Sequence, residues 1–204
     1  MRVIPLPNSG RHYTSNAYLV LGAWNRLSDV NTLVDVGRDP SVIGQIRSAP
    51  TGLGKRKVDR VILTHSHYDH AEMLAAIRQE FHPEVLAYSP SVPGLDRTLV
   101  PGEAIVLGDE EFEVIAIHAH TDDSICLYNP ANGVLFSGDA PVIVHSPGGE
   151  YEPEFVEALG SLCERGVREI YPGHGDPLRE DCGSLLRNSL EMIRRSSRIP
   201  PRRD

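Results

Sequence analysis

The stretch from Thr64 to His70 reads THSHYDH and places three histidines and one aspartate within seven residues. The whole chain has nine histidines among 204 residues, so this local density indicates a metal-binding loop. Imidazole and carboxylate groups are ligands that zinc, iron and manganese accept. The spacing of the four side chains bears on how many ions the loop could serve.

Side chains two residues apart in an extended segment point to the same side, so His65 and His67 can converge on one ion. Asp69 and His70 are adjacent and must aim elsewhere once the chain turns into the helix predicted after them. This spacing favours two neighbouring ions. It differs from the H-E-x-x-H pattern, in which one helix face aligns two histidines on one metal.

One loop cannot complete two sites, so further ligands are expected from other parts of the chain. Candidates follow three predicted strands: His120 in IHAHTDDS, Asp139 in LFSGDA and His174 in YPGHGDP. Ligand sites of α/β folds gather where strands end. We therefore expect these side chains to meet the histidine-rich loop at one edge of the fold.

The elements that position these residues alternate between strands and helices. Short apolar, β-branched runs predict strands over residues 16–21, 31–36, 58–63, 84–88 and 168–171. Between residues 103 and 136 four apolar runs alternate with turns and predict four more strands, two of them over 113–117 and 134–136 and the other two in the runs GEAIVLGD and SICLYNPANG. Helical patterns cover residues 71–81, 153–165 and about 179–194, and a shorter helix over 40–48 has Asp39 as its N-cap and Pro40 at its first position. Turn signals stand at Gly108-Asp109 and Asn132-Gly133. We expect one α/β domain over residues 1–204, with a flexible tail at 196–204.

Composition limits the classes of function. The net charge of −8 argues against a nucleic-acid surface, which is usually basic. No window is apolar enough to span a membrane, and the N-terminus lacks a signal-peptide core. Three widely spaced cysteines, Cys126, Cys163 and Cys182, are expected to be free thiols. We expect a soluble, cytoplasmic protein with a small-molecule partner, and the sequence indicates no oligomeric state.

The stretch THSHYDH resembles the H-x-H-x-D-H motif of the metallo-β-lactamase superfamily. The later His120, the SGD at 137–139 and the PGH at 172–174 resemble the remaining ligand motifs of that superfamily, in the same order. The similarity extends from NAYLV near the start of the chain to His174. It implies a four-layer αββα sandwich of two mixed β-sheets flanked by helices.

The resemblance also assigns the ligands. It implies one ion on His65, His67 and His120, a second ion on Asp69, His70 and His174, and Asp139 as the bridge between them. Two divalent ions are expected, with zinc favoured and iron or manganese as alternatives. Structural zinc sites are closed and often contain cysteine, whereas this set has none and leaves room for water, which favours catalysis.

The chain departs from the pattern of the superfamily beside the ligands. The third motif usually reads T-P-G-H-T-x-G-S, but here His118-Ala119 replace the Pro-Gly pair and Asp123 replaces the second glycine. Residues 71–73, Ala-Glu-Met, stand where small glycines usually follow the first motif. The ligands are retained, while the loops that shape a substrate pocket differ.

Several other polar residues lie near the predicted site. His118 and His145 are candidate substrate contacts, and His118 could instead support or supplement the ligands. Asp35 in LVDVG occupies a position common in the superfamily and is expected to be structural. Asp122 and Asp123 are expected to form a solvated turn.

The resemblance implies a hydrolase in which hydroxide at a dinuclear centre attacks a small ester, thioester or lactone, with Asp69 orienting the hydroxide as a general base. His67 stands where flavodiiron reductases have Glu, and Asp139 where many antibiotic-hydrolysing members have Cys. A glyoxalase II-like enzyme is favoured, although only 30 residues follow His174, so the helical glutathione-binding domain is expected to be absent or reduced. The alternatives are a persulfide dioxygenase-like oxidoreductase with one iron and a non-catalytic binding version of the fold.

Overall fold

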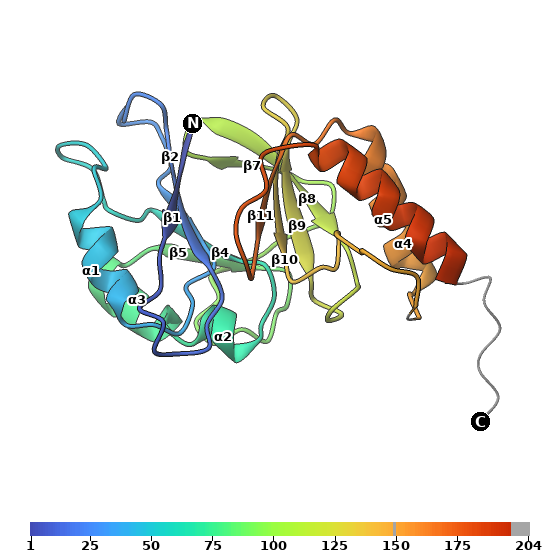
Figure 1. Ribbon diagram of the computed structural model, residues 1–204. Helices are drawn as coiled ribbons and strands as arrows, with labels where there is room; N and C mark the ends of the chain where they lie inside the picture. The colour runs from blue at the N-terminus through green and yellow to red at the C-terminus, as the bar shows by residue number, and fades with distance from the viewer. Residues whose placement is uncertain (149, 197–204) are drawn as a thin grey trace.

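The computed structural model describes residues 1–148 and 150–196 of the chain. Within these residues two β-sheets pack face to face, and helices cover the outer face of each sheet (Figure 1). This arrangement confirms the predicted four-layer sandwich. None of the described helices is long and apolar enough to cross a membrane.

The first sheet is built from the N-terminal half of the chain. Its strands, in hydrogen-bonded order, are β1 (Arg2–Leu6), β2 (Ala17–Leu21), β3 (Thr32–Val34), β4 (Arg60–Leu63), β5 (Glu84–Ala87) and β6 (Arg97–Thr98). The first three pair antiparallel and the rest pair parallel, so the sheet is mixed. Helices α1 (Ser41–Ser48) and α3 (Leu74–Phe81) cover its outer face, and the single-turn helix α2 (Tyr68–Ala71) follows β4.

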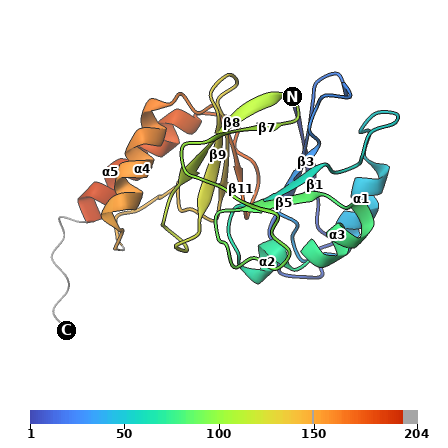
Figure 2. The same cartoon turned by 180° about the vertical axis from the view of Figure 1, so that it is seen from behind.

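The second sheet is built from the C-terminal half. Its strands, in hydrogen-bonded order, are β11 (Glu169–Pro172), β10 (Val134–Gly138), β9 (Ile125–Asn129), β8 (Glu110–Ala116) and β7 (Ala104–Leu107). Only the β10–β11 pair is parallel among the pairs of this sheet in the described residues. Helices α4 (Pro153–Glu164) and α5 (Cys182–Ser196) cover the face that points away from the first sheet (Figure 2).

The central core lies between the two sheets. Phe136 of β10 is buried there, and its ring lies 5.6 Å from the ring of Tyr18 in β2 and 5.3 Å from that of Tyr171 in β11. Strands covered on both faces read as continuous apolar runs. The runs AYLVL of β2 and RVIL of β4 fit that rule, since almost all of their side chains are buried.

The sequence analysis missed two strands and the short helix α2. Strand β1 was not predicted because Pro5 interrupts it, and a proline is tolerated there because β1 is an edge strand. The short strand β6 was also missed. The helix predicted over 71–81 begins only at Leu74, as α3, and residues 68–71 form the separate helix α2. The Met73 N–H between the two helices donates to the carbonyl of Gly37 at 3.1 Å.

Two helix boundaries and part of the tail were also predicted wrongly. Helix α1 begins at Ser41 after Pro40, although Asp39 Oδ1 still accepts the Ser41 N–H at 2.9 Å. Helix α5 begins at Cys182, because Asp181 before it adopts a left-handed φ of 52°. Ser196 does not belong to a flexible tail: it ends α5, and its Oγ accepts the N–H of Gly148 at 2.6 Å. The remaining tail residues, 197–204, lie outside the described residues.

Replacing Phe136 with Ala should destabilise the protein strongly, because the ring fills the space between the sheets. We expect the free energy of unfolding to fall by about 3–5 kcal/mol, measured by urea denaturation of the metal-free protein. Val100→Ala is the control, since this side chain is exposed and its loss should cost less than about 0.5 kcal/mol. Equal losses in the two variants would contradict the central role of Phe136.

Candidate metal centre

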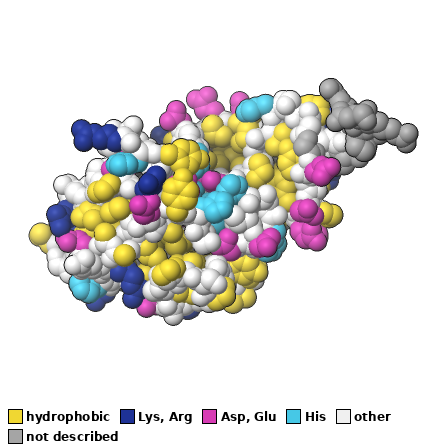
Figure 3. All heavy atoms as spheres, turned by 90° about the horizontal axis from the view of Figure 1, so that it is seen from below, with side chains coloured by type: hydrophobic (Ala, Val, Ile, Leu, Met, Phe, Trp, Pro, Cys, Tyr) yellow, Lys and Arg dark blue, Asp and Glu magenta, His cyan; other side chains and the backbone are white. Residues whose placement is uncertain are grey.

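The candidate ligands come together at one edge of the sandwich, where strands of both sheets end. His65 and His67 follow β4, and Asp69 and His70 lie in α2. His120, Asp139 and His174 follow β8, β10 and β11 of the second sheet. Seen from this side, histidine side chains gather near the middle of the face, beside acidic and hydrophobic side chains (Figure 3).

The first group consists of His65, His67 and His120, whose ligand atoms all lie within 4.8 Å of one another. Nε2 of His120 is 2.9 Å from Nδ1 of His67, which is a hydrogen-bond distance. His65 is buried, whereas the other two side chains are exposed. An ion in this group would therefore be open to solvent on one side.

The second group consists of Asp69, His70, Asp139 and His174, again with ligand atoms within 4.8 Å of one another. Nε2 of His174 lies 3.1 Å from Oδ2 of Asp69, and Nε2 of His70 lies 3.1 Å from Oδ1 of Asp139. This group is deeper than the first, since Asp69 and His70 are buried.

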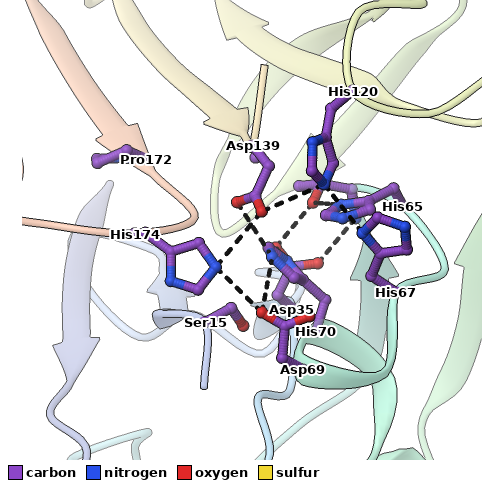
Figure 4. Close-up of polar contacts among 12 residues, drawn as sticks. Ser15, Asp35, His65, His67, Asp69, His70, His120, Asp139, Pro172 and His174 are labelled. Atoms are coloured by element: carbon purple, nitrogen blue, oxygen red, sulfur yellow. Dashed lines mark hydrogen bonds and ion pairs between the residues drawn. The ribbon is translucent and has the colours of Figure 1, made fainter. Parts of the chain in front are cut away.

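Asp139 stands between the two groups (Figure 4). Its Oδ2 is 3.4 Å from Nε2 of His174 in the second group and 3.6 Å from Nε2 of His120 in the first. The structure thus brings together all seven side chains that the sequence singled out. Their roles as ligands and the bridging role of Asp139 remain predictions.

Unpaired buried atoms test whether these residues suit a metal. His65 Nε2 is buried without a hydrogen-bond partner, and His70 Nε2 and Asp139 Oδ1 are buried with only the 3.1 Å contact to each other. A buried polar atom without a partner carries an energetic penalty, and a cation would remove it. Because these atoms point into the two groups, the donor set fits divalent ions.

Asp35 is a buried residue that contacts both His70 and Thr64 beside the centre. One carboxylate oxygen, Oδ2, lies 2.9 Å from Nδ1 of His70 and accepts the hydroxyl of Thr64 at 2.8 Å. The other oxygen accepts the Thr64 N–H at 2.8 Å. Asp35 thus touches no candidate ion position, which agrees with the structural role that the sequence analysis expected.

The electrostatics of the two buried imidazoles differ. Burial lowers the pKa of His65 to about 4, and the neighbouring His70 ring adds to this effect. Burial alone would lower the pKa of His70 too, but the Asp35 and Asp139 carboxylates outweigh it and raise this pKa to about 10. Despite its burial, Asp139 has a pKa below the usual range because His174 and His70 stabilise its anion. The second group is therefore an anionic site that retains a proton when no cation is bound.

Close packing at Gly173 brings the second group together. A Cβ at this position would lie 2.1 Å from Asp139 Oδ1 and 2.7 Å from His70 Cε1. The Gly173 N–H also donates to the carbonyl of Gly138, next to Asp139. Only a residue without a side chain fits here, which gives the PGH triplet a physical reason.

The weaker candidates lie outside both groups. His118 has its Nδ1 2.8 Å from the carbonyl oxygen of Asp122, and its ring lies 6.0 Å from that of Tyr88. His145 is exposed in the segment after β10. Asp123 is not simply solvated as expected: it is half-buried and accepts the hydroxyl of Thr121 at 2.7 Å.

The sequence analysis did not identify two residues of the site that are not candidate metal ligands, Tyr13 and Thr64. Tyr13, in the loop between β1 and β2, stacks on the ring of His174 with centroids 5.1 Å apart. Thr64 connects Asp35 to the metal loop. No spacing pattern marks Tyr13, whereas Thr64 is adjacent to His65 and could have been suspected from that position.

Comparison with known proteins agrees with this geometry. Residues 10–91 and 72–174 match the family model described as Metallo-beta-lactamase superfamily. Hydroxyacylglutathione hydrolase of Mesorhizobium japonicum is 35% identical over 121 residues, which cover 56% of this chain and 47% of that protein. The same-named protein of Hydrogenovibrio crunogenus is 28% identical over 68% of this chain and 48% of its own length.

A solved structure extends the comparison to nearly the whole chain. A metallo-beta-lactamase family protein from Thermus thermophilus superposes with a TM-score of 0.67 at 20% identity, covering 97% of this chain and 79% of that one. This likeness concerns the fold alone. The matches to the two hydrolases span about half the length of each.

Replacing Gly173 with Ala should disrupt the second group while leaving the fold intact, because the new methyl group would collide with Asp139 and His70. We expect at least a roughly tenfold loss of metal affinity, as when a ligand loses its orientation, measured by competition with a chromogenic chelator. Gly160→Ala in α4 is the matched control, because a Cβ there meets nothing within 4 Å. Unchanged affinity in Gly173→Ala would contradict the packing argument.

Metal affinity should rise with pH. His70, whose pKa is raised to about 10, is protonated at neutral pH in the metal-free protein, and a cation at Nε2 must displace that proton. The apparent dissociation constant should therefore fall by roughly tenfold per pH unit over the range in which one proton is released. Chelator competition at several pH values between about 6.5 and 8.5 measures this. A constant affinity would show that no proton is displaced.

Proposed function

Because the chain belongs to the metallo-beta-lactamase superfamily, we propose that it is a metal-dependent hydrolase of a small ester, thioester or lactone. The observation that carries the proposal is the pair of adjoining groups of histidine and aspartate side chains, in which the buried His65 Nε2 has no hydrogen-bond partner. The partial similarity to hydroxyacylglutathione hydrolases supports a thioester as the first substrate class to test. The substrate would be a small molecule, and the protein would act in the cytoplasm.

The seven side chains would hold two divalent ions, most simply zinc. One ion would be held by His65, His67 and His120, the other by Asp69, His70 and His174, with Asp139 between them. Two ions held by these residues would supply an activated water and would polarise the substrate carbonyl. The free cysteines Cys126, Cys163 and Cys182 are not part of either group, unlike in many structural zinc sites.

Asp69 is proposed as the residue that handles the proton of the attacking water. It is buried, and its Oδ2 lies 3.1 Å from Nε2 of His174. The Ser15 N–H donates to its main-chain carbonyl at 3.1 Å, which fixes the position of the residue. A carboxylate held this rigidly can orient the water and accept its proton as the oxygen adds to the carbonyl carbon. The C–S or C–O bond then breaks, and the thiol or alcohol leaves with a proton.

The proposed substrate contacts lie on the open side of the first group. His67 and His120 are exposed there, and His118 lies two residues before His120. His118 and His145 are proposed as weaker contacts with the substrate. Because the segment 118–123 departs from the superfamily pattern, the acyl group accepted here can differ from that of the matched hydrolases.

Metal analysis and hydrolysis assays test the proposal together. The purified protein should contain about two ions per chain and should hydrolyse members of a panel of thioesters, esters, lactones, phosphodiesters and β-lactams. His67→Ala should lower metal content and reduce kcat/KM by at least about a hundredfold, because the first group loses a ligand.

The control for this variant is His82→Asn, which changes an exposed histidine at the end of α3 whose left-handed φ of 53° asparagine tolerates. It should retain both metal and activity. Hydrolysis that survives in metal-depleted His67→Ala would refute the proposal. One iron per chain, together with oxygen consumption when a persulfide is supplied as the substrate, would favour the oxidoreductase alternative instead.

A further inference from the structure

A buried hydrogen-bond chain joins one histidine of each group. It runs from His65 through Thr64 and Asp35 to His70, and all four residues are at most 2% exposed. The contacts are 3.3 Å from His65 Nδ1 to Thr64 Oγ1, 2.8 Å from Thr64 Oγ1 to Asp35 Oδ2, and 2.9 Å from Asp35 Oδ2 to His70 Nδ1. These hydrogen bonds lie away from solvent, so water does not replace any of the four side chains.

The chemistry of Asp35 gives this chain a direction. A carboxylate accepts hydrogen bonds and has no hydrogen to donate, so both of its neighbours must donate to it. The Thr64 hydroxyl therefore points its hydrogen at Asp35 and offers a lone pair to His65. The facing nitrogen of His65, Nδ1, must then carry the hydrogen of the neutral ring.

The same reasoning applies to His70 without an intermediary. Its Nδ1 donates to Asp35 directly, which leaves Nε2 to face the second group. The Nε2 atoms of both rings are buried: that of His65 lacks a hydrogen-bond partner, and that of His70 lies 3.1 Å from Asp139 Oδ1 in the second group. Both rings are thus oriented so that the nitrogen away from the chain faces a candidate ion.

We infer that Asp35 fixes a ring hydrogen on Nδ1 of one ligand in each group, directly at His70 and through the Thr64 hydroxyl at His65, so that Thr64 is a positioning residue for the first group. This inference rests on the proposed metal binding but not on hydrolysis. It assigns Thr64 a role that no ligand motif requires, since its side chain touches no candidate ion position.

The substitution Asp35→Asn should reverse the direction of the hydrogen bonds between residue 35, Thr64 and His65. The Thr64 N–H keeps the amide oxygen at the Oδ1 position, so the amide nitrogen takes the Oδ2 position and donates to Thr64 Oγ1. The hydroxyl hydrogen is then free to donate to His65 Nδ1, and the ring proton moves to Nε2. In that tautomer His65 has no lone pair to offer the first group.

Long-range ¹H–¹⁵N NMR of the histidine rings in the metal-free protein tests the chain. Wild type and Thr64→Ser should carry the His65 hydrogen on Nδ1, and Asp35→Asn should carry it on Nε2. In Thr64→Val, which keeps the shape but removes the hydroxyl, adding Asp35→Asn should leave the His65 tautomer unchanged. Persistence of the Nδ1–H form in Asp35→Asn would overturn the inference. So would an equal effect of Asp35→Asn with and without the Thr64 hydroxyl, which would indicate a through-space effect of charge.

Zinc affinity provides a second readout that needs no turnover. Asp35→Asn should weaken both groups by about 10–100-fold, whereas Thr64→Val should weaken only the His65 group and Thr64→Ser should restore it. Thr64→Ser behaving like Thr64→Val would overturn the role of the hydroxyl. A wild-type protein that binds zinc but hydrolyses nothing would defeat the proposed function and leave the inference standing. A wild-type protein that binds no zinc would defeat the metal proposal and with it the positioning role.

Discussion

Two carboxylates, Asp69 and Asp139, converge on the imidazole of His174 at one half-buried point, and the surrounding structure has to hold all three side chains there. Both contact Nε2 of His174, at 3.1 and 3.4 Å. The negative charge of the two carboxylates would attract a divalent ion to this point. The main chain around them must hold both side chains rigidly.

Main-chain hydrogen bonds supply much of that rigidity. The carbonyl of His70 accepts the N–H groups of Val36 and Gly37, and the carbonyl of Asp69 accepts that of Ser15. Helix α2 is only a single turn, so it would not be stable on its own. It is held by the loops after β1 and β3, which explains how adjacent ligands can point into one group.

The centre also depends on the packing of the two sheets, because the Ile125 N–H of β9 donates to the carbonyl of Thr64 at 2.9 Å, across the junction between the sheets. Ligands from both halves of the chain therefore meet only when the central core has formed.

The sequence was sufficient to single out the seven side chains that the structure brings together, and the resemblance to the superfamily supplied the four layers. Ligand spacing in THSHYDH and apolar strand runs are visible within a few residues. Strand β1 and the interruption between α2 and α3 depend on partners far along the chain, namely β2 and the carbonyl of Gly37. The exclusion of a side chain at Gly173 and the link from Asp35 to Thr64 arise only from packing in three dimensions, so no spacing rule reveals them.

The segment before His120 shows how a departure from the superfamily pattern is accommodated. His118 adopts a positive φ of 29°, a region that favours glycine and is uncommon for residues with a side chain. Its Nδ1 closes a hydrogen bond to the Asp122 carbonyl at 2.8 Å, which offsets part of the strain by tying the turn together. The result is a closed turn that keeps the ring of His118 beside Tyr88. Strained turns of this kind persist where the surrounding structure fixes them. The altered residues therefore reshape the approach to His120 without displacing it from the first group.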